Sequence, residues 1–172
     1  TVPATVTIPA NQSTAYFSVT GVDVGSTQIE ATAAGATAAA PMPVDVITPT
    51  VIFNSLDGNR STSSVRDNFS IFLRVPGAFW TDNQYAVNAL TVGVLLTDQT
   101  PAGVVNGIYD DNGNLVTQLS IGKNSTTSAT GYIAQPAAAG SYRLQADIAG
   151  IATAKSAVQT VTAAQQALQI TR

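Results

Sequence analysis

Apolar and polar residues alternate with a period of two in short runs along most of this chain. In residues 68–75, Phe69, Ile71 and Leu73 fall on one face and polar residues fall mostly on the other. This alternation is typical of a β-strand with one buried face, and runs spaced about ten residues apart are typical of a β-sandwich. Helical periodicity is almost absent. The chain is therefore predicted to be all-β.

The first segment, residues 1–47, is predicted to hold only the closing strands of a sandwich. Alternating runs at residues 4–10, 14–20, 26–33 and 38–47 are spaced like sandwich strands. They are too few to close a sandwich, because each one-sided strand needs a second sheet to cover its apolar face. Of two explanations for the missing opening strands, a cut through a repeat is favoured over a vacancy for a neighbour's strand.

The second segment, residues 48–162, supplies enough runs for a complete sandwich of two packed sheets. The predicted strands are residues 50–56, 68–75, 90–96, 104–109, 114–121, 127–134, 140–148 and 152–161. Residues 163–172 are predicted to be a linker and the first strand of a following repeat. Leu168 and Ile170 would lie on the apolar face of that strand.

The first segment also carries a familiar order of motifs. VTIPANQ at residues 6–12 leads to FSVTG at 17–21 and then to GSTQIEA at 25–31. This order resembles the second half of the bacterial immunoglobulin-like repeats of adhesins and other surface proteins. Asn11 stands where those repeats usually have Gly, a mild departure because Asn tolerates the left-handed backbone. The resemblance implies immunoglobulin-like β-sandwiches in tandem, with the first one incomplete.

Residues 139–144, AGSYRL, resemble the start of the penultimate strand of immunoglobulin-like sandwiches. In such sandwiches a tyrosine pins the corner through a hydrogen bond between its hydroxyl and an upstream backbone group. Tyr142 stands at that position. The cysteine found two residues later in antibody domains is Leu144 here. Tyr142 is therefore expected to be the structural corner of the second segment.

Residues 110–114, DDNGN, are predicted to form a tight hairpin turn. Asp, Asn and Gly are the residues that such turns require. The same stretch offers oxygen atoms to Ca²⁺ from Asp110, Asp111, Asn112 and Asn114, although no bidentate acid follows at the spacing of a calcium loop. The turn is favoured, with Ca²⁺ as the alternative and no other cofactor expected.

Phe79, Trp80 and Tyr85 are the best candidates for ligand recognition. Pro76 and Gly77 come just before them and indicate a shaped loop, the usual place for a binding site. Flat rings on a loop can stack on sugar faces. The only tryptophan of a sandwich is more often packed in the core, where its large apolar area is buried. Packing is favoured, and a sugar-binding platform is the alternative.

Composition excludes most catalytic machinery. The chain has no His and no Cys, so Ser-His-Asp triads, Cys-His pairs and imidazole or thiolate metal sites cannot form. Carboxylate pairs remain, but nothing indicates perturbed acids in a cleft. The seven Lys and Arg residues are scattered, and the apolar runs are shorter than the roughly 20 residues of a membrane helix. We expect no enzymatic activity, no nucleic-acid binding and no membrane insertion.

These features predict a structural or adhesive segment of a large bacterial protein that is extracellular, on the cell surface or secreted. The lack of cysteine fits an exported bacterial protein better than a small disulfide-stapled domain. Its partners would be neighbouring repeats, copies of itself, surface glycans, or a host or matrix protein. One alternative is a carbohydrate-binding or accessory module of a secreted enzyme. Another is a fibre subunit in which Leu168 and Ile170 of one molecule pair with the exposed edge of residues 2–47 in the next.

Overall fold

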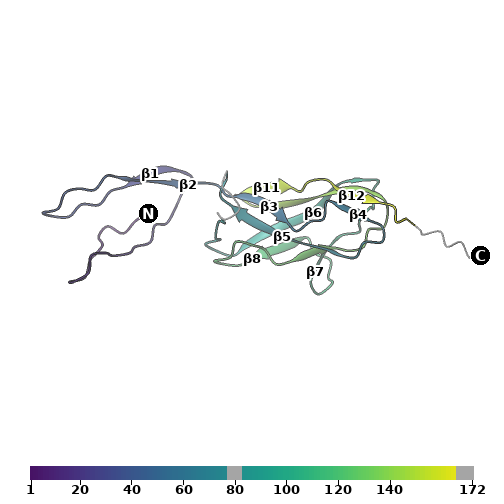
Figure 1. The fold of residues 1–172 in the computed structure, drawn as a ribbon, viewed down its shortest axis with the longest axis horizontal. Helices are drawn as coiled ribbons and strands as arrows, with labels where there is room; N and C mark the ends of the chain where they lie inside the picture. The colour runs from purple at the N-terminus through teal and green to yellow at the C-terminus, as the bar shows by residue number, and fades with distance from the viewer. Residues whose placement is uncertain (77–82, 166–172) are drawn as a thin grey trace, which may run out of the picture. The chain divides into compact units, whose positions relative to one another are not determined.

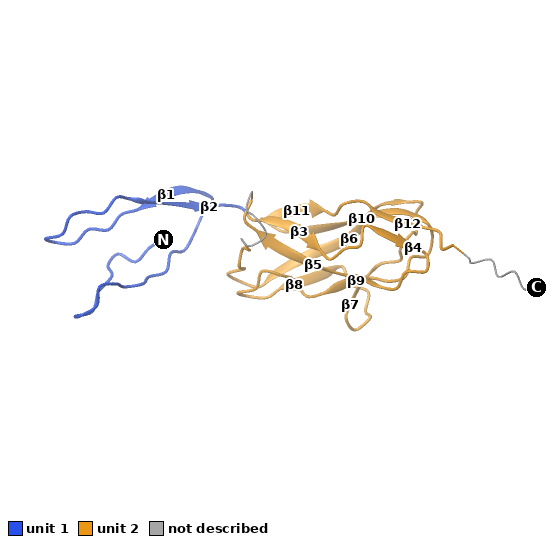
Figure 2. Ribbon diagram, viewed as in Figure 1, with its two compact units in different colours: residues 1–48 blue, residues 49–172 orange. Residues whose placement is uncertain are grey.

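The computed structural model describes residues 1–76 and 83–165, and these contain strands and turns but no helix. The all-β prediction is therefore confirmed. The chain divides into two compact units, residues 1–48 (unit 1) and residues 49–172 (unit 2), shown in Figures 1 and 2. Within the described ranges, nothing helical is long and apolar enough to cross a membrane.

Unit 1 contains a two-stranded antiparallel sheet made of β1 (Gly25–Ile29) and β2 (Met42–Val46). Paired residues of such a sheet share a face, so Thr27 with Val44 and Ile29 with Met42 make one face largely apolar. The other face is polar: the Ser26 hydroxyl donates a hydrogen bond to Asp45 at 2.6 Å.

The strands expected at residues 4–10 and 14–20 are not formed. The structure describes all of residues 1–24 and assigns no strand there, although the Thr20 N–H donates to the Thr1 carbonyl at 3.0 Å. Asn11, between the two runs, has a left-handed φ of 65°. Alternation alone does not make a strand, because the backbone groups also need a partner to pair with.

Unit 2 contains two larger sheets, consistent with a β-sandwich. The six-stranded sheet has the order β4 (Asn59–Ser61), β12 (Gln159–Thr162), β10 (Gly140–Ile148), β6 (Leu90–Thr100) and β8 (Gln118–Ile121), with β11 (Ala152–Lys155) also paired to β10. The four-stranded sheet has the order β3 (Thr50–Asn54), β5 (Asp67–Arg74), β9 (Gly131–Ile133) and β7 (Ile108–Asp110). Neighbouring strands are antiparallel except β4 and β12, which are parallel.

The buried faces of both sheets contribute to one hydrophobic core. In β5, Phe69, Ile71 and Leu73 are buried as the alternation predicts, while Phe72 lies half-buried on the outer face. The other core side chains, from the rest of unit 2, are Val51, Ala86, Val92, Val94, Val104, Val105, Ile108, Leu119, Ile121, Ile133, Tyr142, Leu144, Ala146, Ile148 and Val161. This core is what holds the two sheets together.

Unit 2 differs from the prediction in several places. The strands predicted at residues 104–109, 114–121 and 127–134 are shorter, as β7, β8 and β9. The predicted strand at residues 152–161 is split into β11 and β12, because Ser156 interrupts it: its N–H donates to the Leu144 carbonyl, and its hydroxyl accepts from the Leu144 N–H at 3.0 Å. The strand β4 was not predicted. Its buried residue is Arg60, so no apolar alternation marks it.

The chain enters and leaves unit 2 at opposite ends. β11 lies beside β3 and pairs with residues 145–148 of β10, whereas β12 pairs with residues 140–142 at the other end of β10. Figure 2 shows the same arrangement, with the segment before β3 at one end of unit 2 and the segment after β12 at the other. A strand of nine residues such as β10 spans about 30 Å.

Candidate functional site

A buried polar cluster joins three strands of unit 2 around the Arg60 side chain. Arg60, on β4, is only 5% exposed, and Tyr142, on β10, is fully buried. The guanidinium donates from Nη1 to the Tyr142 hydroxyl at 3.4 Å and from Nη2 to the carbonyls of Val65 and Ala134. The predicted corner residue Tyr142 therefore has the Arg60 side chain as its hydroxyl partner, where an upstream backbone group was expected.

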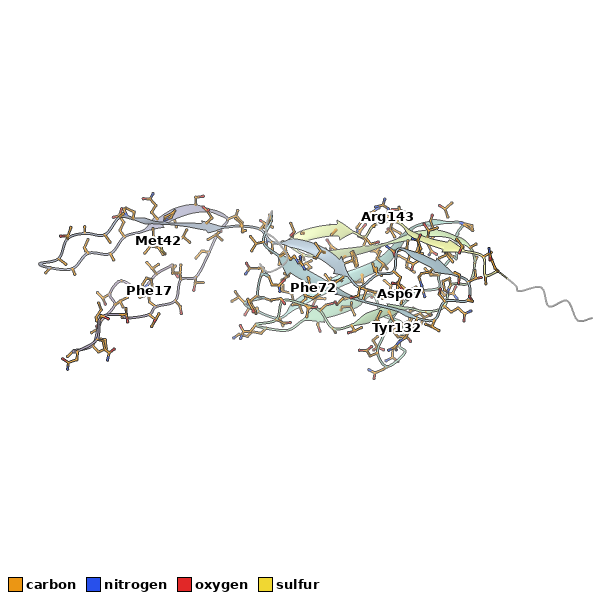
Figure 3. All side chains as sticks on the ribbon, viewed as in Figure 1. Phe17, Met42, Asp67, Phe72, Tyr132 and Arg143 are labelled. Atoms are coloured by element: carbon orange, nitrogen blue, oxygen red, sulfur yellow. The ribbon has the colours of Figure 1, made fainter. Side chains whose placement is uncertain are left out.

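Asp67, at the start of β5, is the acidic member of this cluster (Figure 3). Its carboxylate accepts hydrogen bonds from the Asp57 N–H at 3.2 and 3.4 Å. Burial raises the pKa of Asp67, and the Asp57 hydrogen bond and the Arg60 charge offset part of that rise. Burial also raises the pKa of the Tyr142 hydroxyl, against an opposing effect from Arg60. The cluster is enclosed, so we interpret it as a structural tie between β4, β5 and β10.

Residues 110–114 form the predicted hairpin turn. The Asp110 carboxylate accepts hydrogen bonds from the N–H groups of Asn112 and Asn114, both at 2.9 Å, and from the Asn114 side-chain amide at 3.1 Å. These bonds hold the pKa of Asp110 below its ordinary value. Gly113 closes the turn with a φ of 85°, a value that favours glycine. The Asp110 oxygens are thus used within the turn, and Asp111 and Asn112 are exposed beside it.

The candidate recognition residues lie only partly within the described chain. Tyr85 is 63% exposed, as a ligand-stacking ring would be. Phe79 and Trp80 lie outside the described residues, so the sugar-binding platform stays a prediction. Leu168 and Ile170 lie outside them as well. In the described ranges, no group of three or more acidic, His or Cys side chains could hold a metal ion.

A row of two half-buried tyrosines and their neighbours on the outer face of the four-stranded sheet was not identified in the sequence analysis. Tyr109 of β7 and Tyr132 of β9 are directly paired, and their rings stack with centroids 5.5 Å apart and planes 21° apart. The Arg66 guanidinium lies 4.9 Å from the Tyr132 ring centroid. Leu115, which is 65% exposed, is paired with Tyr109 in an isolated antiparallel β-bridge. We call these four side chains the tyrosine row; Figure 3 labels Tyr132.

The tyrosine row has a sequence signal that alternation alone does not reveal. Tyr109 follows the buried Ile108 and Tyr132 precedes the buried Ile133, so both rings must stand on the outer face of the sheet. Tyr and Arg are the side chains that protein interfaces use most as anchors. Cross-strand stacking also stabilises a sheet by itself. The row can therefore stabilise the sheet and offer apolar contact to a protein neighbour.

No protein-family model matches this chain, and no curated protein is significantly similar to it. Its function has to be argued from its own residues and topology.

Proposed function

We propose that this chain is an immunoglobulin-like segment of a large extracellular or cell-surface protein, in which unit 2 acts as a load-bearing spacer. The observation that carries the proposal is that the chain enters and leaves unit 2 at opposite ends. Domains joined in this way extend one after another as a rod. The motifs in residues 6–31, which resemble bacterial surface repeats, support the same setting.

The strand order of unit 2 supports the immunoglobulin-like assignment. The first part of the unit is divided between the sheets, with β3 beside β5 in one and β4 parallel to the last strand, β12, in the other. When β3 and β4 are counted as one divided first strand, and β11 and β12 as one divided last strand, β5 and β10 are the second and penultimate strands. They lie in opposite sheets, as the corresponding strands of immunoglobulin-like sandwiches do. Tyr142 is the third residue of β10, close to where such sandwiches carry their corner tyrosine.

The parallel pairing of β4 and β12 supports a mechanical role. Tension on the two ends of unit 2 would slide these strands past each other, so their hydrogen bonds would be loaded together. Two backbone hydrogen bonds add to the pairing of β4 with β12. The Thr160 N–H donates to the Gly58 carbonyl, and the Thr62 N–H donates to the Thr162 carbonyl, both at 3.0 Å. The Thr162 hydroxyl adds a bond to the Arg60 carbonyl at 3.2 Å.

Single-molecule force measurements on the chain, held at its two ends, test the spacer role. Thr160→Pro removes the N–H that donates to Gly58, so we expect a clearly lower unfolding force. Val158→Pro is the matched control, because Val158 lies just outside β12 and is 45% exposed. An equal, low unfolding force for the unmodified chain and both variants would contradict the proposal.

The tyrosine row favours adhesion as a second function of unit 2. Leu115, which is 65% exposed, is the residue of the row to change without opening the core. We expect Leu115→Glu to weaken attachment of the chain to surfaces coated with matrix protein. Leu95→Glu is the control, because Leu95 is 44% exposed on the other sheet. Equal attachment of the two variants would show that the tyrosine row does not contribute to adhesion.

A further inference from the structure

Unit 1 has apolar side chains but no core to place them in. Across residues 1–48, which the structure describes in full, no side chain is buried. On the apolar face of the β1–β2 sheet, Val44 and Val46 are half-exposed and Met42 is 57% exposed. A two-stranded sheet of this kind is at best marginally stable in water. The apolar face of β2 is therefore open to another strand beside Met42 and Val44, whereas Gly21 lies close to the Val46 side chain.

The outer edge of β2 is the better of the two edges for an added strand. Within the described chain, β2 pairs only with β1, so its other edge has unpaired backbone groups, although Pro43 has no N–H to donate there. Met42, Val44 and Val46 all point to one face of β2, whereas Ile29 is the only large apolar residue on that face of β1. A strand beside β2 would thus bury more apolar surface than one beside β1.

Charge indicates what kind of strand fits this edge. Unit 1 contains Asp23, Glu30 and Asp45 but no Lys or Arg, so it carries the full net charge of −3 of the chain. Two copies of unit 1 placed face to face would repel each other. A strand that is apolar on one face and carries no negative side chain fits better.

We propose that residues 168–172 of a neighbouring copy, with the sequence LQITR, add to the outer edge of β2. Leu168 and Ile170 are two residues apart, so in an extended strand both fall on the face of Val44 and Val46. Arg172 is the only charged side chain of residues 163–172, and its sign is opposite to that of unit 1. Apolar burial supplies most of the affinity, and the charge favours this partner over a second unit 1.

The proposed donor belongs to another copy. Within one copy, residues 163–167 would have to run back from β12, at one end of unit 2, to the end where β3 begins. The contact joins different surfaces on the two copies, so it repeats head to tail instead of closing. This inference goes beyond the spacer role, which a monomer could equally perform.

The binding test uses a fluorescent peptide of residues 163–172 and a chain that ends at residue 165. We expect saturable binding by fluorescence anisotropy, with Val44→Lys weakening it about tenfold or more. Gln28→Lys adds the same charge on the polar face of β1 and should leave binding unchanged. A peptide with Leu168→Lys and Ile170→Lys should not bind, a result that does not depend on how any chain variant folds.

The assembly test compares the full chain and the shortened chain by sedimentation velocity over a range of concentrations. Only the full chain should increase in mass as its concentration rises. Absence of peptide binding, or equal weakening by Val44→Lys and Gln28→Lys, would overturn the inference. Association of the shortened chain would also overturn it, by identifying a second unit 1 as the partner. None of these outcomes changes the unfolding force of unit 2, so the spacer role is tested separately.

Discussion

Units 1 and 2 share the same alternating pattern of apolar residues but differ in what covers it. In unit 2, Phe69 is 1% exposed because the six-stranded sheet lies over it. In unit 1, Phe17 is 46% exposed and Met42 57% exposed, and Figure 3 shows their side chains without a covering layer. The pattern thus specifies which side of a strand is apolar. Burial, and with it most of the stability, depends on a second sheet.

Hydrogen exchange tests most directly whether only unit 2 has a stable core. We expect amides of β5 and β10 to exchange at least ~1,000-fold more slowly than those of β1 and β2, because only the former require opening of a core. Exchange detected by mass spectrometry after proteolysis would measure this. The chain ending at residue 165 should be used, so that no donor strand is present. Comparable protection in both units would show that unit 1 is stable by itself.

Glycine substitutions should affect the stability of the two units differently, with a smaller effect than in hydrogen exchange. Gly140, in unit 2, has a φ of 153°, and an added Cβ would lie 2.3 Å from the Thr100 carbonyl oxygen and 2.7 Å from Val104. We expect Gly140→Ala to lower the free energy of unfolding by roughly 2–5 kcal/mol. Gly35, in unit 1, has a φ of 78° with open space around it. Gly35→Ala should leave the urea midpoint of unit 2 unchanged, and an equal shift in both variants would be inconsistent with separate units.

The buried cluster should contribute less than the core. Tyr142→Phe removes the acceptor for Arg60 Nη1 but keeps the ring in place, so we expect a loss of about 1 kcal/mol in the free energy of unfolding. Tyr85→Phe, at an exposed ring, is the control and should have no effect. Urea denaturation followed by circular dichroism would measure both. A neutral Tyr142→Phe would mean that the hydroxyl does not help to join β4 and β10.

The pH dependence of unit 2 should be the smallest effect. The pKa of Asp67 is raised in the folded state. At pH values between its ordinary pKa and this raised pKa, folding is therefore accompanied by uptake of a proton. The Asp67 contribution to stability is therefore present at lower pH and is lost as the pH rises through that window. Asp67→Asn should remove it. Asp110, whose pKa is lowered, should act in the opposite sense and lose its contribution as the pH falls. Thermal unfolding from pH 3 to pH 8 would separate the two residues.

The strands of the core could be predicted because they are buried on one side only. Phe69, Ile71 and Leu73 alternate with less buried residues, and this period of two is what a strand with one covered face requires. Phe72 breaks the pattern, and the structure places it half-buried on the outer face, 5.9 Å from the Arg74 guanidinium. An apolar residue at an outward position is tolerated when a neighbouring side chain partly covers it.

Three features could not be predicted, because they depend on partners distant in sequence: strand β4, the absence of strands at residues 4–10 and 14–20, and the tyrosine row. β4 has no apolar alternation, since its inward residue is Arg60, whose partner Tyr142 is 82 residues away. The runs at residues 4–10 and 14–20 alternate correctly but pair with no strand in the part of the chain that the structure describes. The tyrosine row becomes evident only when β7 and β9 are known to be neighbours. Local pattern therefore predicts which face of a strand is apolar, and the fold decides which partner that face meets.

The parallel pairing of β4 with β12 also sets when unit 2 can finish folding during its synthesis. Arg60 pairs with Val161, so an early strand has to wait until about a hundred further residues have been made. Contacts between such distant parts of a chain form late and slowly. Until Thr162 emerges, the β4 side of the growing sheet stays open. Unit 2 is therefore completed only when its last strand, β12, has been made.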